Sequence, residues 1–382
     1  MKPRRRVLVI ARHFWPATND DTLRLFYWTQ QLVGQGAAVT VVTPRWHNSW
    51  PRRVVCDGVT VIRLDHPPSH SLRFGSYGRQ LSQWLNSCGD FDLVYCDSSD
   101  ADAATVLSQI ERTAPVVVRF TELAEGPKAL VKALEVCRRA NLVLVNTHSA
   151  QKVLLAAGIQ RPFICRTGQV LGTRFDRSPE ARRLARKVLG DCNHDLFART
   201  QDRVLVCPGE LSRDWGVLEL LRELSPLIEE QRSLRVWLLG DSRERPGIYQ
   251  RLRHEGLHRL VAMPGIFTDL EEVMQAADLC IFPAPGAGLG WLLPTCLASG
   301  LPVLVADSPD ARWLLGEQAA QLTVRIEQPD QLRGLVTQWL TDPTPWVCSA
   351  AEARKYAADS PAASLSCEDL FLLLEGSARR HA

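Results

Sequence analysis

The chain has 382 residues, of which 46% are hydrophobic and 23% are charged, and its formal net charge at pH 7 is +3. This length and composition can bury enough apolar surface for two domains of ordinary size, which excludes disorder for most of the chain. The modest charge comes without a recognised binding motif, so we expect no nucleic acid among the partners.

The N-terminal segment Met1–Arg6 is basic, and the apolar run that follows it, Val7–Ala11, is interrupted by Arg12 and His13. This run is too short for an export signal or a membrane-spanning helix, so we interpret it as a first β-strand. Residues 1–65 hold ten Lys or Arg against four Asp or Glu. We expect a cytoplasmic protein. The basic cluster is either a peripheral contact at the inner membrane surface, a contact for a phosphorylated substrate, or an ordinary solvated surface.

Short apolar runs alternate with longer amphipathic stretches through the first part of the chain. Parallel strands that are covered by helices produce this alternation. We expect strands at Val7–Ala11, Ala38–Thr43, Val59–Leu64, Leu93–Cys96, Val116–Phe120 and Leu142–Val145, and helices at Thr22–Gln35, Gly78–Asn86, Ala101–Arg112 and Ala150–Ala157.

The alternation restarts after a charged stretch without periodicity, residues 177–203. We expect strands at Val204–Cys207, Leu234–Leu239, Val261–Met263, Leu279–Phe282 and Val303–Ala306, and helices at Gly216–Gln231, Pro246–Glu255, Leu270–Ala276, Leu292–Ser299 and Asp330–Leu340. Two successive α/β units predict a pair of Rossmann-like domains facing each other across a cleft, with ligands bound beyond the carboxyl ends of the strands.

These two series of elements set the expected domain boundaries. We expect an N-terminal domain over residues 1–175, an interdomain linker over 176–203, a C-terminal domain over 204–345, and helices that pack back on the N-terminal domain over 346–382. The last part rests on helical patterns at Ala350–Ala358 and Leu365–Glu375.

The cysteines and acidic residues give no sign of a disulfide framework or a metal centre. Eleven cysteines is an odd number, and no Cys-x-x-Cys pair occurs, so we expect free thiols in a reducing compartment. No cluster of His, Cys, Asp and Glu has the spacing of metal ligands, and we expect no metal and no cofactor. Asp278 and Asp307, at strand boundaries, are expected to cap or close turns.

A strand, a glycine turn and the start of a helix follow one another in the segment Val206–Leu221. Alone, this pattern is a weak phosphate-loop signal. Three further segments follow in order: Val236–Arg245, Ala276–Ala284 and the glycine- and proline-rich Gly286–Pro302. Together these four segments resemble the C-terminal half of the retaining family-4 glycosyltransferases of the two-domain GT-B fold.

The first half adds weaker support to this resemblance. Phe14-Trp15-Pro16, followed by a long helical pattern and Val39–Pro44, is similar to the opening of those enzymes. The resemblance covers the chain from about Arg6 to Leu340. It implies an N-terminal acceptor-side domain and a C-terminal nucleotide-sugar-side domain. It also implies a nucleotide-diphosphate sugar as donor and a glycan or lipid-linked acceptor, in the assembly of a glycan or glycolipid.

The residues that handle the donor diphosphate in that family are changed in this chain. The family holds the diphosphate with an Arg and a Lys, because the leaving group gains negative charge. In the segment that begins at Gly209, the matching positions are Glu210 and Trp215. A carboxylate repels a diphosphate, and an indole does not neutralise one. Gly240 and Asp241, after the next strand, complete the expected donor side.

Two family glutamates, one near the transferred sugar and one on the ribose, match Ala287 and Thr295. The chain therefore has no catalytic carboxylate at these positions, and Thr295 offers at most a hydroxyl to the ribose. The glycine skeleton between them, Gly288, Leu289 and Gly290, is retained as a candidate binding segment.

Other family features have changed as well. Asn19 and Asp20 match two glycines that let a loop approach the donor phosphates, and they bring side chains and a negative charge. The hinge motif of the family is matched by Gly168–Leu171. The histidines that often follow a strand of the first domain in that family are matched by Tyr95–Asp97. The donor contacts are lost while the structural glycines are retained. This pattern is expected when a protein keeps the fold of an enzyme and loses its catalytic activity.

Several residues remain as candidates for a rewired site. Arg213, Arg243 and Arg245 follow strands and are either replacement cations for the diphosphate or ordinary surface arginines. Glu210 is alternatively a salt-bridge partner for one of them. His13, after the first strand, is either a general base or acceptor contact, or a loop histidine bonded to backbone.

Tryptophans are the remaining candidate ligand contacts. Trp215 and Trp291 are the best placed to stack on a sugar, and core packing is the expected role of the other tryptophans.

Three functions follow from these observations. The first is a catalytically impaired pseudo-glycosyltransferase that binds an active glycosyltransferase partner or a glycan. The alternative is an active nucleotide-sugar-dependent retaining transferase, in the hexosyltransferase class, with a rewired donor site. A sugar-nucleotide epimerase of the same fold is the weakest, because it needs the donor contacts that are missing.

Overall fold

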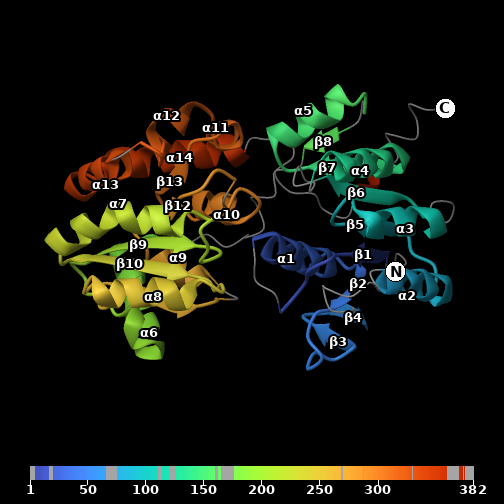
Figure 1. Ribbon diagram of the computed structural model, residues 1–382, viewed down its shortest axis with the longest axis horizontal. Coiled ribbons are helices and arrows are strands. Elements are labelled where there is room, and N and C mark those ends of the chain that lie inside the picture. Colours follow the sequence, from blue (N-terminus) through green and yellow to red (C-terminus); the bar gives the residue numbers. More distant parts are fainter. Residues whose placement is uncertain are drawn as a thin grey trace. The chain divides into compact units, whose positions relative to one another are not determined.

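In the computed structural model, the chain forms two compact units. The first unit comprises Met1–Ala17, Arg24–Cys165 and Ser364–Ala382, and the second comprises Thr18–Leu23 and Arg166–Ala363. The structure describes residues 5–16, 20–65, 75–110, 114–120, 126–159, 162–164, 176–267, 270–286, 288–328, 330–358, 370–372 and 374. Each unit is an α/β domain built on a mostly parallel sheet (Figure 1).

The described strands of the first unit form an eight-stranded sheet in the order β3-β4-β2-β1-β5-β6-β7-β8. All neighbours are parallel except β3 and β4, which form a hairpin. Asp57 and Gly58 close that hairpin with positive φ angles of 47° and 80°, the conformation that an Asp-Gly turn adopts readily. The strands are β1 (Arg6–Ile10), β2 (Ala38–Arg45), β3 (Arg53–Cys56), β4 (Val59–Asp65), β5 (Leu93–Cys96), β6 (Val116–Phe120), β7 (Leu142–Val145) and β8 (Pro162–Ile164).

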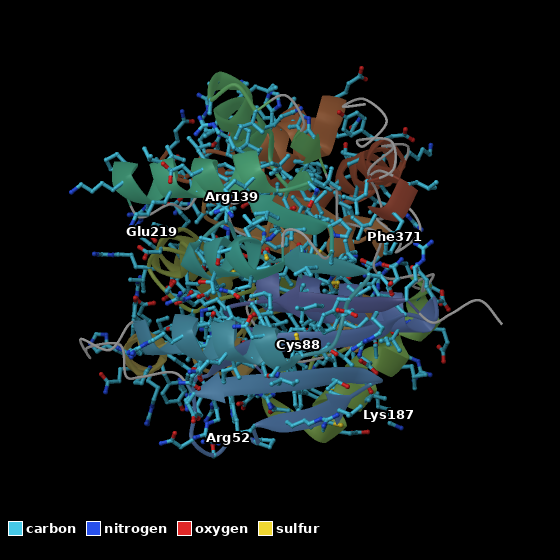
Figure 2. The ribbon with its side chains drawn as sticks, turned by 90° about the vertical axis from the view of Figure 1, so that its right-hand side faces the viewer. Arg52, Cys88, Arg139, Lys187, Glu219 and Phe371 are labelled. Atoms are coloured by element: carbon cyan, nitrogen blue, oxygen red, sulfur yellow. The ribbon has the colours of Figure 1, made fainter. Side chains whose placement is uncertain are left out.

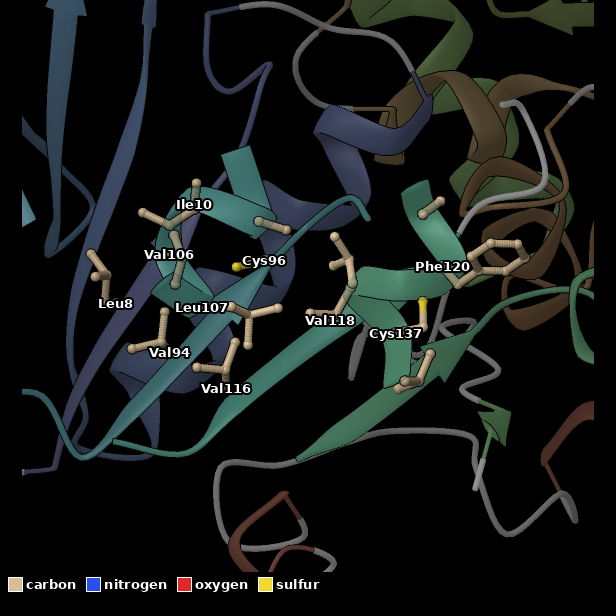
Figure 3. Packing of buried hydrophobic residues seen from close by; sticks show 14 of the residues in the cluster. Leu8, Ile10, Val94, Cys96, Val106, Leu107, Val116, Val118, Phe120 and Cys137 are labelled. Atoms are coloured by element: carbon tan, nitrogen blue, oxygen red, sulfur yellow. The ribbon is translucent and has the colours of Figure 1, made fainter. Parts of the chain in front are cut away.

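Both faces of this sheet are buried, because successive residues of a strand point to opposite sides. In β1, Leu8 and Ile10 join the core under α2 to α5, and Figure 3 shows them beside Val94 and Val106. Val7 and Val9 face the other core. The helices of the unit are α1 (Asp20–Gly34), α2 (Gly75–Ser87), α3 (Ala101–Ile110), α4 (Pro127–Arg139) and α5 (His148–Ala156). The first four residues of α1, Asp20–Leu23, group with the second unit.

The C-terminal end of the chain contributes to the second of these cores. Leu370 and Leu374 are buried together with residues of α1 and β1. The guanidinium carbon of Arg5 lies 3.8 Å from the ring centroid of Phe371, which is labelled in Figure 2. Apolar burial and a cation–π contact therefore attach this segment to the first unit.

The described strands of the second unit form a six-stranded parallel sheet in the order β11-β10-β9-β12-β13-β14. They are β9 (Arg203–Pro208), β10 (Leu234–Leu239), β11 (Val261–Gly265), β12 (Leu279–Phe282), β13 (Val303–Ala306) and β14 (Thr323–Val324). Its helices are α6 (Pro179–Cys192), η1 (His194–Leu196), α7 (Val217–Glu230), α8 (Arg245–His254), α9 (Glu271–Ala276), α10 (Leu292–Ala298), α11 (Pro309–Leu315), η2 (Gly316–Gln318), α12 (Ala319–Leu322), α13 (Gln331–Thr341) and α14 (Thr344–Ala358).

Helix α6 lies in the stretch that sequence analysis interpreted as charged and without periodicity. Its inner face carries a buried arginine where a helix of a globular domain usually has an apolar residue. Arg186 donates from Nε to the carbonyl of Ala276 at 3.0 Å and from Nη2 to the carboxylate of Asp278 at 2.5 Å. Asp278 is thus the buried partner of α6, and its expected role as a cap or turn residue was wrong.

The C-terminal helices, the cysteines and the length of the helices can each be compared with the expectations from the sequence. The helical pattern expected at Ala350–Ala358 falls inside α14, and most of Leu365–Glu375 lies outside the described residues. All nine cysteines in the described ranges are free thiols. Among the helices that the structure describes, none is both long and apolar enough to cross a bilayer.

Candidate functional site

Three loops of the second unit meet at the carboxyl ends of β9, β10 and β12. A Cβ at Gly240 would lie 1.7 Å from the carbonyl oxygen of Gly209, so the first two loops touch through their backbones. A Cβ at Gly216 would lie 2.8 Å from the carbonyl oxygen of Pro283, which joins the third loop to the start of α7. Glycines at these positions permit a close backbone approach that any side chain would prevent.

Trp215 covers the first of these glycines. Gly209 has a φ of 132°, and the position of its missing Cβ is 2.2 Å from Cε2 of the Trp215 indole. The indole Nε1 donates to the carbonyl of Pro208 at 3.1 Å. The half-buried ring therefore rests against the strand end, at the place where the family resemblance implies a cationic side chain.

The charged candidates around this loop are all at the surface or bonded elsewhere. Glu210 and Arg243 are exposed. Arg213 is exposed too, and its backbone nitrogen donates to the carboxylate of Glu244 at 3.1 Å. Arg245 donates from Nη2 to the carbonyl of Met263 at 2.8 Å.

No hydrogen bond or ion pair between described residues joins the three arginines to one another or to Glu210. The exposed carboxylate of Asp241 lies 3.9 Å from Nη1 of Arg245. A diphosphate-binding role for these arginines, and a salt bridge from Glu210, stay predictions.

The backbone amides at the start of α10 are bonded to a carboxylate of the chain itself. Asp20 accepts hydrogen bonds from the backbone nitrogens of Gly290 at 3.0 Å, Trp291 at 3.1 Å and Leu292 at 2.8 Å. Asp20 belongs to the segment Thr18–Leu23, which groups with the second unit. Three successive amide donors form a site for an anion, and here the side chain of Asp20 supplies the negative charge.

The protonation of Asp20 reflects competing effects of its surroundings. Burial, and next the nearby carboxylate of Asp21, raise the pKa of Asp20 to about 6, while the three amide donors lower it. Removal from water thus outweighs the hydrogen bonds. At neutral pH the group is still mainly ionised, so the amides hold a carboxylate.

Replacement of Asp20 by Asn is expected to change how stability depends on pH. The folded-state pKa of about 6 exceeds the ordinary value of 3.8. The stabilisation from protonated Asp20 is therefore full below about pH 4 and is lost as the pH rises through about 6. Urea denaturation at about pH 4 and about pH 8 should show a smaller decline in the free energy of unfolding for Asp20→Asn than for the unmodified protein.

Asp214→Asn is the control for this comparison, because Asp214 is exposed on a neighbouring loop. It should leave the decline unchanged. An equal decline in Asp20→Asn and in the unmodified protein would contradict the assignment of a raised pKa to Asp20.

The loop that precedes α10 folds back over the end of β12. Gly288 has a φ of 67°, and its missing Cβ would lie 2.2 Å from the ring of Phe282. Leu289 and Thr295 are buried, with 5% and 2% of their surfaces exposed. Trp291 is 1% exposed, so its expected role in stacking on a sugar was wrong and it is a core residue.

A small cavity lies between the first two of these loops and the start of α10. A cavity lined by Gly209, Gly240, Phe267, Leu292 and Leu23, among others, has a volume of about 20 Å³. This is room for about one water molecule, whereas pockets for small ligands measure roughly 300–1,000 Å³. Leu23 comes from the same short segment as Asp20, so this segment contributes an apolar side chain to the cavity as well as a carboxylate beside α10.

Three sequence candidates lie outside the described residues: Asn19, Ala287 and the segment Gly168–Leu171. His13 is described and belongs to the first unit. Its exposed ring stacks on the indole of Trp46, with centroids 4.8 Å apart and planes 8° apart. His13 is thus on the surface near the end of β1, and its role as base or acceptor contact stays a prediction.

A buried ionic cluster at the carboxyl end of β5 was missed by the sequence analysis. Asp97 accepts from Nε of Arg119 at 3.1 Å, from the hydroxyl of Tyr95 at 3.0 Å, and from Arg24. The signal was present in the sequence, because an arginine within the buried strand β6 requires a counter-charge. Asp97 therefore joins α1, β5 and β6 through buried hydrogen bonds and ion pairs, which is a structural role.

A second carboxylate group lies beside this cluster. Asp100 and Asp102 are each 4.0 Å from Nη1 of Arg12. Burial, and next the charge of Asp100, raise the pKa of Asp102 to about 7, while Arg12 lowers it. Asp102, in the helix that follows β5, is thus able to exchange a proton near neutral pH.

Comparison with family models divides the chain as the two units do. Residues 24–165 match the family described as Glycosyltransferase Family 4. Residues 202–342 match the family described as Glycosyl transferases group 1. A search of curated proteins finds no significant match.

Solved structures with the same fold span the whole chain. A sucrose-phosphate synthase from Thermosynechococcus elongatus has a TM-score of 0.73 at 15% identity, covering 99% of each chain. HepE from Anabaena, solved with UDP and glucose, has a TM-score of 0.69 at 16% identity, covering 99% of each chain. A glycosyltransferase from Rickettsia africae has a TM-score of 0.66 at 12% identity, covering 99% of this chain and 98% of its own. At such identities the likeness is one of fold.

Proposed function

We propose that this chain is a pseudo-glycosyltransferase. It carries the family-4 and group-1 domains of a GT-B-fold glycosyltransferase. In this account it keeps the fold of a nucleotide-sugar enzyme and does not transfer sugar. Its role lies in glycan or glycolipid assembly, where it binds an active glycosyltransferase partner or a glycan. The ancestral reaction would be retaining, with a nucleotide-diphosphate sugar as donor and a glycan or lipid-linked acceptor.

The observation that carries this proposal is the carboxylate of Asp20 on the amides of Gly290, Trp291 and Leu292. A donor phosphate at these amides would have to displace a tethered anion of the same charge sign. The family resemblance places the loop of Asp20 beside the donor phosphates. The carboxylate of Asp20 therefore supports the proposal, because it occupies amides that a donor phosphate would need.

The surrounding charges support the same conclusion. Glycosyl transfer from a nucleotide sugar needs a cation or fixed donors at the leaving diphosphate. Here Trp215 stands against Gly209, and Glu210 contributes a negative charge at the surface. Neither supplies the compensation that a departing diphosphate requires.

The relevant ligands for a test come from the neighbours of known structure. HepE from Anabaena was solved with UDP-glucose as well as with UDP. UDP-glucose is therefore the first nucleotide sugar to offer this chain. We expect that incubation of the unmodified protein with a panel of nucleotide sugars releases no nucleoside diphosphate above background.

A variant that restores the family residues provides the positive test of the same proposal. The quadruple variant Glu210→Arg, Trp215→Lys, Ala287→Glu and Thr295→Glu, combined with Asp20→Gly, should bind a nucleotide sugar that the unmodified chain does not bind. Glu229→Arg with Glu230→Lys is the control, because it adds the same two cations at exposed positions on α7. Donor turnover by the unmodified protein would establish the active, rewired transferase in place of this proposal.

A further inference from the structure

A second, larger cavity lies on the second unit. It has a volume of about 820 Å³ and shares no lining residue with the small cavity beside Gly209 and Gly240. Its floor is Val261–Met263 of the edge strand β11, and its walls come from η1 and the first turns of α8. Volumes of this size are typical of pockets that hold small molecules.

The charges in this cavity are mostly positive. Two of its arginines are held in place by the protein: Arg235 donates from Nε to Asp202 at 3.1 Å, and Arg245 donates from Nη2 to Met263 at 2.8 Å. Arg259 makes no hydrogen bond or ion pair with any residue of the described ranges, and it is exposed. The basic residues of the lining are Arg235, Arg245, Arg259, His194 and His258, and the acidic one is Asp195.

Two aromatic rings line the same cavity. Phe197 is 50% exposed and Tyr249 is 47% exposed, although large apolar side chains usually gain by burial. Phe197 also stacks on His194, with centroids 6.0 Å apart. A cavity lined by rings and guanidinium groups matches a ligand that has both a ring to cover and an anionic group to neutralise.

We propose that this cavity binds the phosphate ester of a sugar. The phosphate lies against Arg259 and Arg235, where a guanidinium can donate two parallel hydrogen bonds to its oxygens. The sugar ring lies against Tyr249. A membrane surface fits less well, because the cations line a hollow. Arg245, a candidate cation at the donor site, also lines this cavity, but the ligand contacts proposed here come from Arg259, Arg235 and Tyr249. None of these three is a donor-site candidate, so the inference is independent of the proposed function.

Calorimetric titration of the full chain with glucose 1-phosphate tests this site. We expect saturable binding of glucose 1-phosphate, and weaker binding of inorganic phosphate and of glucose alone. Arg259→Gln and Tyr249→Ala should each weaken the binding of glucose 1-phosphate roughly tenfold or more, as loss of a charge-assisted hydrogen bond or of a stacking surface does. Both positions are exposed, so the variants should fold like the unmodified protein.

Arg253→Gln is the matched control, because Arg253 is an exposed arginine of α8 that does not line the cavity. It should bind glucose 1-phosphate like the unmodified protein. Absence of saturable binding, or equal affinity in Arg259→Gln, Tyr249→Ala and the control, would overturn the proposal. Inorganic phosphate that binds as tightly as the sugar ester would overturn the role of the ring.

Discussion

Asp278→Ala is expected to lower the free energy of unfolding by about 3–5 kcal/mol, because it leaves a buried guanidinium without its counter-charge. The carboxylate of Asp278 accepts from Arg186 at 2.5 Å, from Arg182 at 2.6 Å and from the backbone nitrogen of Val204 at 2.8 Å. The side chain of Arg186 is only 4% exposed. Its charge cannot regain water without separating α6 from the sheet.

Asp307→Ala is the control for this prediction. Asp307 makes an equally short pair with Arg312, at 2.5 Å, but 57% of the Arg312 side chain is exposed. Exposed pairs of this kind contribute about 0–1 kcal/mol. Urea denaturation of both variants should therefore give a large loss for Asp278→Ala and a small one for Asp307→Ala. Equal losses would contradict the role of burial in this network.

Gly240→Ala is expected to lower the free energy of unfolding by about 3 kcal/mol or more, through a steric clash and backbone strain. The new Cβ would lie 1.7 Å from the carbonyl oxygen of Gly209, and the φ of Gly240 is 137°. Relief requires the ends of β9 and β10 to separate. Thermal denaturation should show the loss directly as a lower midpoint.

Gly247→Ala is the matched control for this substitution. Gly247 lies in α8, and a Cβ there would have no atom within 4 Å. Alanine in a helix is favoured over glycine by about 0.5–1 kcal/mol, so this variant should be slightly more stable than the unmodified protein. A Gly240→Ala variant as stable as Gly247→Ala would show that the two loops do not touch as described.

Much of the fold could be predicted from local patterns, and the predicted pair of Rossmann-like domains with the GT-B fold is confirmed. The run Leu142–Val145 is apolar at every position and forms β7 with these bounds. Helix α6 could not be predicted from periodicity, because Arg186 occupies its buried face and its stabilising partner, Asp278, is 92 residues away in the sequence. The buried apolar residues beside it, Ala185 and Leu189, are few, and Leu184 and Val188 of the same helix are exposed, so the apolar pattern of the sequence does not mark the buried face.

The candidate site was only partly accessible to the same reasoning. The sequence indicates that Asp20 brings a negative charge to a phosphate-binding loop, but not where its carboxylate goes. Its partners, Gly290 to Leu292, lie about 270 residues away and contribute only backbone nitrogens, which no residue pattern marks. Trp291 was misplaced for a related reason. Its position in a glycine-rich loop suggested exposure, while its indole packs in the core.

The proposed loss of sugar transfer rests on the carboxylate of Asp20, which occupies the amides of Gly290, Trp291 and Leu292 in a chain with the GT-B fold. Calorimetric titration of the unmodified protein with UDP-glucose at neutral pH tests it most directly. We expect no saturable heat of binding at the donor site. Saturable micromolar binding that the control Glu229→Arg with Glu230→Lys retains, and that the donor-site substitution Gly209→Ala abolishes in a folded protein, would contradict it.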